Sequence, residues 1–477
     1  MPASQEEIAY LPATELLRHY RAQELSPVEV LEAQLDRADV LGSTVNALTW
    51  RFDDAARALA REAEARYLGK GSEPRPLEGI TLAIKEEMAV TGQPITSASR
   101  IYSDAVAKHT APLAERAIAA GAIVHARTTQ PEFACVGFTQ SDLFGITRNP
   151  WNLDYDVGGS SGGAGAALAS GLTTLAAGSD IGGSIRIPAA CCGVVGFKPP
   201  YGRVPQLPPF NLDHYCHEGP LARTIADCAL FENLISGPSP VDIASLRERV
   251  ELPLDASGVS GLRVALSLDL GGWEPDDDVR RNTLNAAAAL RDAGAVVEEV
   301  QIPIRREDVD RAANAHFATI FGPSVAALVA EHRDIMTSYA IGFAEAMVLD
   351  GPGAYLEGLE IEGVITGAIG TLLERFDALI CPTLTIPALH VDAAWTGRKS
   401  ETGIGLQSFD HAMTIPFNIA SRCPVLNVPS GFAATGVPTG LQLAGRTFDD
   451  EVPFRLGAAL ERAGLWDYAT RRPTLPI

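Results

Sequence analysis

Short apolar runs alternate with amphipathic stretches along most of the chain. The runs 80–84, 122–126 and 376–383 are largely apolar, which is typical of strands buried on both faces of a sheet. The longer stretches 279–293 and 452–463 repeat apolar residues at helical spacing. This alternation predicts an α/β fold. The same patterns predict a helix at 111–120 and further strands at 262–267, 295–300, 425–428 and 440–443.

The N-terminal part of the chain is predicted to be helical. Ser26, Pro27 and Glu29 match a capping box with proline at the first helical position, and 53–67 is a second amphipathic run. We therefore expect a helical region over 1–70 that packs on the core. No linker long enough to force a further division follows, so 71–477 is expected to form one large α/β domain.

Two glycine-rich segments in the middle of the chain each contain a serine. The first is Gly158-Gly159-Ser160-Ser161-Gly162-Gly163, and the second is Ser179-Asp180-Ile181-Gly182-Gly183-Ser184. The segment 165–175 between them is rich in Ala and Leu and predicts a buried helix. Backbone N–H groups in such glycine loops can converge on an anionic oxygen. A loop, a helix and a second loop would bring Ser160 and Ser184 together.

The predicted strand 80–84 is followed directly by Lys85. Burial of a lysine favours its neutral amine, which is a base. A serine needs such a base to become a nucleophile at neutral pH. Lys85 and the two serines therefore suggest nucleophilic catalysis.

These motifs together resemble the amidase signature family of serine hydrolases. The resemblance covers about Ser26 to Glu461, and its core motifs are Lys85, GGSSGG and DIGGSIRIPA. Further segments that match in order are 148–152, 196–203, 219–224 and 440–443. The resemblance implies a large mixed, mainly parallel twisted sheet flanked by helices on both faces. It also implies a variable segment at about 305–410 that covers the substrate, with helices at 305–375 and a polar loop at 391–410.

The resemblance implies a Ser–Ser–Lys triad. Ser184 would be the nucleophile and Lys85 the base, and Ser160 would pass the proton between them. Ser160 would follow a cis peptide bond after Gly159. The oxyanion hole would consist of the backbone N–H groups of Ile181, Gly182, Gly183 and Ser184.

Residues around the triad are expected to support it. Ser161 is expected to donate a hydrogen bond to, or accept one from, Lys85, and Asp180 and Arg186 are expected to form an ion pair that holds the loop. Aromatic and flexible apolar side chains are candidates for the substrate pocket, with packing in the core as the alternative reading of each. These candidates are Phe133, Phe138, Tyr339, Phe343, Met347 and Tyr355.

The resemblance implies an amide hydrolase that works through a serine acyl-enzyme and needs no metal or organic cofactor. We expect a neutral, apolar or aryl amide as substrate, with esters and carbamates as further substrates of the same chemistry. The alternative within the family is the amidase component of a tRNA-dependent amidotransferase, which works with partner proteins. Residues 418–424 depart from the family pattern, which suggests a different pocket wall.

Two other readings of the glycine loops are weaker. Gly158 to Gly162 matches the G-x-S-x-G nucleophile elbow of α/β-hydrolases, with His390 and His411 as possible partners, but 152–157 does not resemble the strand that an elbow requires. The loops could instead hold a phosphate. However, they lack the Lys-Ser/Thr end of a P-loop and do not match G-x-G-x-x-G.

Composition narrows the class of partner. The 477 residues carry a net charge of −21, which disfavours nucleic acids and anionic membranes as partners. No apolar stretch is long enough to predict a transmembrane helix, and residues 1–10 lack the basic start of a signal peptide. The seven scattered cysteines favour a reducing compartment and show no metal-site spacing. We expect a cytoplasmic monomer or homodimer that binds a small molecule.

Overall fold

One sheet dominates the computed structural model, which describes residues 4–349, 351, 353–393 and 409–475. Within these residues the sheet has 11 strands in the order β1-β3-β2-β6-β8-β7-β12-β13-β11-β9-β10. The strands are β1 Leu48–Arg51, β2 Thr81–Lys85, β3 Ile123–Thr128, β6 Leu175–Asp180, β7 Val195–Lys198, β8 His217–Ala222, β9 Arg263–Leu266, β10 Val296–Glu299, β11 Ala378–Pro382, β12 Val425–Phe432 and β13 Pro438–Gly445. A separate two-stranded sheet pairs β4 Gln140–Ser141 with β5 Gly145–Ile146.

The large sheet is mixed, as expected, but it is not mainly parallel. Parallel pairing joins β2 to β3 and β6, and joins β9 to β10 and β11. The other six of the ten neighbouring pairs are antiparallel. One reason is the short hairpin between β12 and β13. A parallel pair needs a long crossover connection, so two strands joined by a short hairpin can only pair antiparallel.

Helices cover both faces of the sheet. The α-helices of the described residues are α1 Gln5–Tyr10, α2 Ala13–Arg21, α3 Pro27–Val45, α4 Asp53–Tyr67, α5 Pro112–Ala119, α6 Gly162–Ala169, α7 Arg186–Cys192, α8 Ile225–Ile235, α9 Asp277–Asp292, α10 Arg306–Ile320, α11 Gly322–His332, α12 Ser338–Ala346, α13 Ala354–Arg375, α14 Pro416–Ile419 and α15 Glu451–Arg462. Gly457 of α15 lies against Leu426 and Val428 of β12. Asn427 points to the opposite face, where Ala190 of α7 packs over β13.

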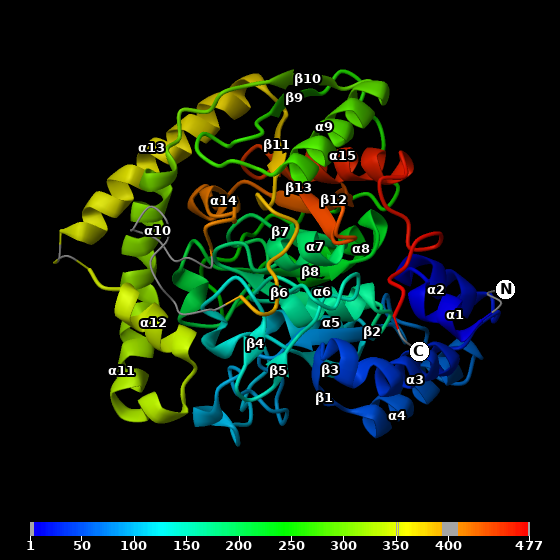
Figure 1. Ribbon diagram of the computed structural model, residues 1–477. Helices are drawn as coiled ribbons and strands as arrows, with labels where there is room; N and C mark the ends of the chain where they lie inside the picture. The colour runs from blue at the N-terminus through cyan, green and yellow to red at the C-terminus, as the bar shows by residue number, and fades with distance from the viewer. Residues whose placement is uncertain (1–3, 350, 352, 394–408, 476–477) are drawn as a thin grey trace.

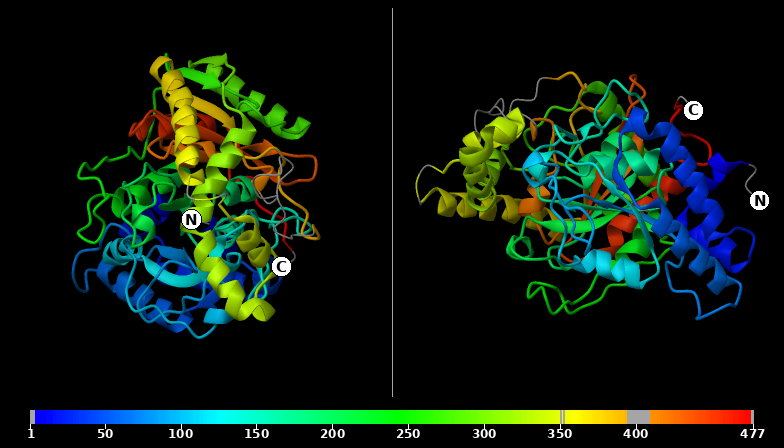
Figure 2. Two further views of the ribbon diagram at one scale, coloured as in Figure 1. Left: turned by 90° about the vertical axis from the view of Figure 1, so that its left-hand side faces the viewer. Right: turned by 90° about the horizontal axis from the view of Figure 1, so that it is seen from below.

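Helices α10 to α13 form a lobe at one edge of the molecule, distant from α1 to α4 (Figure 1). The right-hand view of Figure 2, from below, shows the same separation. The lobe core, an apolar cluster that includes Val309, Phe317, Tyr339 and Phe343, continues into the sheet at Leu379 and Val425. In the described part of the chain no single helix is long and apolar enough to cross a membrane, although the bent pair α10 and α11 meets that test by length and composition.

Most predicted elements are present. The capping box of Ser26 starts α3, and α4 covers the predicted run 53–67. Two predictions need correction: the N-terminal region also contains β1, which joins the sheet beside β3, and the run 165–175 contains the end of α6 and the start of β6 rather than one helix. The polar loop predicted at 391–410 lies mostly in 394–408, outside the described residues.

Candidate active site

Lys85 is the last residue of β2, which is buried along its whole length between β3 and β6. The Lys85 side chain is fully buried. Its Nζ donates hydrogen bonds to Ser160 Oγ at 2.7 Å and to Ser179 Oγ at 2.8 Å. Nζ also lies 2.9 Å from Oε1 of Glu87. The parallel pairing of β2 and β6 brings Lys85 and Ser179 to the same edge, since parallel strands end on the same side of a sheet.

Ser160 lies in the first glycine loop, immediately before α6. The Gly159–Ser160 peptide bond is cis, as the resemblance implies. Glycine is required at 159 because a Cβ there would lie 2.5 Å from the backbone nitrogen of Phe138. The Ser161 N–H donates to the backbone oxygen of Ser184 at 3.2 Å, which joins the two glycine loops.

Ser184 lies just before α7 and is 2% exposed. The structure therefore places Lys85 against Ser160, and places Ser184 beside the residue that follows Ser160. The Ser184 hydroxyl makes no hydrogen bond to any described residue. The link from Ser160 to Ser184 stays a prediction.

The second glycine loop presents fewer free amides than expected. Gly183 N–H donates to Asp180 Oδ1 at 2.9 Å, so it is already satisfied within the loop. The N–H groups of Ile181, Gly182 and Ser184 donate to no acceptor in the described part of the chain. Three amides, rather than the expected four, are thus available in this geometry for an oxyanion.

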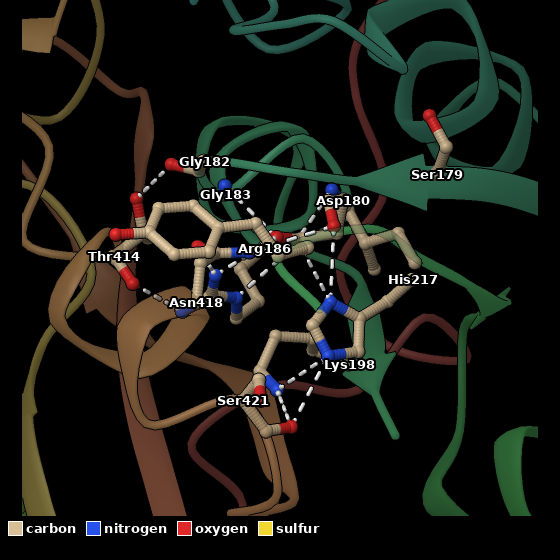
Figure 3. Close-up of polar contacts among 12 residues, drawn as sticks. Ser179, Asp180, Gly182, Gly183, Arg186, Lys198, His217, Thr414, Asn418 and Ser421 are labelled. Carbon is tan, nitrogen blue, oxygen red and sulfur yellow. Dashed lines mark hydrogen bonds and ion pairs between the residues drawn. The ribbon is translucent and has the colours of Figure 1, made fainter. Parts of the chain in front are cut away.

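Asp180 and Arg186 form the expected ion pair beneath this loop (Figure 3). Their closest atoms are 2.9 Å apart and both side chains are fully buried. Arg186 also donates to Gln442, to Asn418 and to the backbone oxygen of Thr414. Burial raises the pKa of Asp180, but Arg186 and Asn418 outweigh it, so the pKa lies well below the usual value and Asp180 stays ionised.

Ser161 does not contact Lys85, contrary to expectation. Its hydroxyl donates instead to the backbone oxygen of Ser179 at 3.2 Å. Ser179 takes the predicted place of Ser161, because β6 pairs in parallel with β2 and its end lies beside Lys85. Glu87 is a second contact of Lys85 that the sequence patterns did not reveal. Its position only two residues after Lys85 is the one available signal.

A second buried lysine holds the segment that departs from the family pattern. Lys198 Nζ donates to the backbone oxygens of Ser421 and Cys423, and lies 3.3 Å from Nε2 of His217 (Figure 3). Burial lowers the pKa of Lys198 to about 7 and that of His217 to about 3. No residue of 418–424 lines the cavity described below, and the suggestion that this segment forms a different pocket wall stays a prediction.

A cavity of about 420 Å³ opens beside Ser160, Ser179 and Glu87. Its wall is mainly apolar and aromatic, with the acidic residues Glu87, Asp180 and Glu218 also among its lining. The apolar and aromatic wall residues include Met88, Ile95, Tyr102, Phe133, Ile181, Leu207, Phe210, Phe321, Val325 and Leu328. Ser184 is not among the described residues that line it.

Only one of the predicted pocket residues lines this cavity. Phe133 does so, whereas Phe343 lines a smaller apolar space beside Phe321. Phe138 and Tyr339 pack edge to face, with ring centroids 5.2 Å apart, and Met347 is buried in the lobe core. All three are buried core residues, and the Tyr339 hydroxyl is held by the backbone of Glu132 and Gln140. Tyr355 is not among the described lining residues either.

A group of possible metal ligands lies between the loop before β8 and α10. One ligand atom of each of Asp213, His214 and His316 lies within 4.8 Å of the others. These groups already bond to protein partners: Asp213 Oδ1 lies 2.8 Å from Nε2 of His316, and Nε2 of His214 lies 3.2 Å from Glu362 Oε2. The contacts tie α10 and α13 to the sheet.

All seven cysteines are free thiols.

Comparisons with known proteins place the chain in a family. The family model described as Amidase matches residues 29–452. The chain is 33% identical to an acylamidase of Rhodococcus erythropolis, over 98% of each chain. It is 32% identical to one component of the glutamyl-tRNA(Gln) amidotransferase of Geobacillus kaustophilus, over 97% of this chain and 98% of that one.

A solved structure of a bacterial aryl acylamidase of the amidase signature family superposes with a TM-score of 0.88 and 29% identity, over 96% of this chain and 97% of that one. The fold, the motifs and the extent of these matches agree along almost the whole sequence. The chain belongs to the amidase signature family.

Proposed function

We propose that this protein hydrolyses small, apolar or aryl amides through an acyl-enzyme on Ser184. The observation that carries the proposal is the buried hydrogen bond of 2.7 Å from Lys85 Nζ to Ser160 Oγ, beside a mainly apolar cavity that Ser160 lines. A neutral Lys85 takes the Ser160 proton, and Ser160 takes the Ser184 proton. Ser184 Oγ then attacks the substrate carbonyl.

The charge that develops on the carbonyl oxygen is stabilised by backbone N–H groups of Ile181, Gly182 and Ser184. Removal of one such donor typically costs about 10²–10³ in rate. The proton on Lys85 returns through Ser160 to the leaving nitrogen, and the amine departs. Water then cleaves the acyl-enzyme by the same path. Esters and carbamates react by the same steps.

The aromatic wall of the cavity supports an apolar or aryl substrate. Its lining includes the aromatic residues Tyr102, Phe133, Phe210 and Phe321. Such rings favour flat apolar groups. The likeness to acylamidases supports the same substrate class.

The second candidate is the amidase component of a tRNA-dependent amidotransferase, which the comparable identity to the Geobacillus kaustophilus protein favours. The net charge of −21 disfavours association with tRNA. The test is a panel of p-nitroanilides, aryl carbamates, esters and primary amides with the purified chain alone. Turnover of anilides supports the proposal. Release of ammonia from glutamine alone would overturn it in favour of the amidotransferase role.

A further inference from the structure

Glu87 contacts Lys85 and Ser179 at once, and we propose that it is the positioning residue that directs the Lys85 amine toward Ser160. Its Oε1 lies 2.9 Å from Lys85 Nζ and accepts a hydrogen bond of 2.5 Å from the Ser179 hydroxyl. Lys85 is fully buried, whereas the Glu87 side chain is 27% exposed at the cavity wall. This inference rests on the proposed function, in which Lys85 is the base.

The number of hydrogen bonds around Lys85 Nζ carries the argument. Nζ has three partners, which are Ser160, Ser179 and Glu87. An ammonium group has three N–H donors and matches all three partners. The neutral amine, which the reaction needs, has only two N–H groups and one lone pair. The lone pair has to face Ser160 if the amine is to accept the proton of that hydroxyl.

Glu87 fixes which partners receive the two remaining N–H groups. A carboxylate can only accept, so it takes one of them. Ser179 has a single O–H, which it donates to Glu87, and it therefore presents a lone pair to Lys85. Ser179 takes the second N–H. The third direction of the neutral amine is then the lone pair, and it faces Ser160.

The charges around Glu87 make it the anion that acts on Lys85. The other titratable groups that face it are Cys216 and Glu218, from the end of the loop before β8 and from β8 itself. Burial and the charge of Glu87 raise the pKa of Glu218 to about 8, and burial raises the pKa of Cys216 well above its usual value. Both groups are neutral at pH 7. Asp180 is paired with Arg186.

Two effects follow from loss of the Glu87 carboxylate. The neutral amine loses a fixed acceptor and no longer holds its lone pair on Ser160. The ammonium form of Lys85 also loses a stabilising charge, so the neutral form is reached at lower pH. The first effect lowers the maximum rate, and the second moves the acidic limb of the pH profile.

The test is the pH profile of kcat/KM of Glu87→Gln on a p-nitroanilide that the wild type hydrolyses. We expect the plateau to fall by about 10- to 100-fold, because small misplacements of reacting groups cost about this much. The loss falls on kcat, with KM changed less than about twofold, and the acidic limb moves to lower pH by about one unit. Glu73→Gln is the control, since it removes an exposed carboxyl group outside the site; its plateau and acidic limb stay at the wild-type values.

Glu87→Asp keeps the charge but shortens the reach, so it keeps the wild-type acidic limb and lowers the plateau. It provides the measurement if Glu87→Gln does not fold, as judged by circular dichroism. The role of Glu87 alone would be overturned if Glu87→Gln kept the wild-type plateau and acidic limb. If Glu87→Gln does not fold, the same conclusion would follow from a wild-type plateau in Glu87→Asp. A wild type that cleaves no amide, ester or carbamate would overturn the proposed function, and the role of Glu87 with it.

Discussion

The backbone N–H of Ser161 donates to the backbone oxygen of Ser184 at 3.2 Å. This bond joins the two glycine loops at the residues that flank or carry the proposed chemistry. Ser160 and Ser184 thus sit on two segments with a common anchor, and the ion pair of Asp180 and Arg186 supports the second segment from below. The backbones of the two serines are therefore held side by side by a main-chain contact.

Replacement of Ser184 by alanine is expected to abolish amide hydrolysis, because no acyl-enzyme can form. Lys85→Ala is expected to lower kcat/KM by about 10²–10⁴-fold, the usual contribution of a general base. The measurements are anilide turnover and the mass of the adduct with a fluorophosphonate. Ser257→Ala, at an exposed position, is the control and keeps both. A fluorophosphonate adduct that persists in Ser184→Ala would rule out this nucleophile.

Loss of Arg186 is expected to destabilise the fold strongly. Arg186→Met leaves the buried carboxylate of Asp180 without its counter-ion, which costs about 3–5 kcal/mol in the free energy of unfolding. Urea unfolding measures the effect. The matched control is Arg333→Gln, which removes an exposed pair with Glu345 worth less than about 1 kcal/mol. Equal losses in the two variants would contradict a special role for the buried pair.

Glu218 makes stability depend on pH. Burial and Glu87 raise its pKa to about 8 in the folded protein, above the ordinary value of 4.5. The folded chain therefore keeps a proton that the unfolded chain loses, and the contribution of Glu218 to stability falls as pH rises from about 4.5 to 8. Glu218→Gln is expected to raise Tm relative to the wild type more at pH 9 than at pH 5. Glu73→Gln, on the surface, gives a difference in Tm that does not change with pH; the same behaviour in Glu218→Gln would disprove the shift.

The ring of Phe133 is expected to contribute to binding of aryl substrates. It lines the cavity and packs edge to face with Tyr102, with ring centroids 6.4 Å apart. Phe133→Leu removes an aromatic contact worth about 0.5–1.5 kcal/mol, so KM for an anilide rises about 2- to 12-fold. Steady-state kinetics on an anilide and on a small aliphatic amide compare the two substrates. An equal rise in KM for both would indicate a general change in the site instead.

Local patterns in the sequence predicted much of the fold and the main polar residues of the site. The apolar run before Lys85 and the capping box at Ser26 each depend on a few neighbouring residues, and both predictions are confirmed. The contact of Ser179 with Lys85 depends on where α6 ends and β6 begins, and on the parallel pairing of β6 with β2. The place of Glu87 depends on the turn after β2, in which Met88 N–H bonds to the backbone oxygen of Lys85. Sequence spacing does not encode these long-range and turn geometries.

The helical lobe of α10 to α13 leaves the sheet after the edge strand β10 and returns at β11, two strands inward. It contributes Val325 and Leu328 to the cavity, whereas Lys85, Ser160 and Ser179 come from the opposite half of the sheet. The lobe can therefore be lengthened, shortened or exchanged in evolution without a change of strand register or of the reacting groups. A chimera that receives the lobe of a relative should inherit that relative's choice of amide while it keeps its own acid–base behaviour.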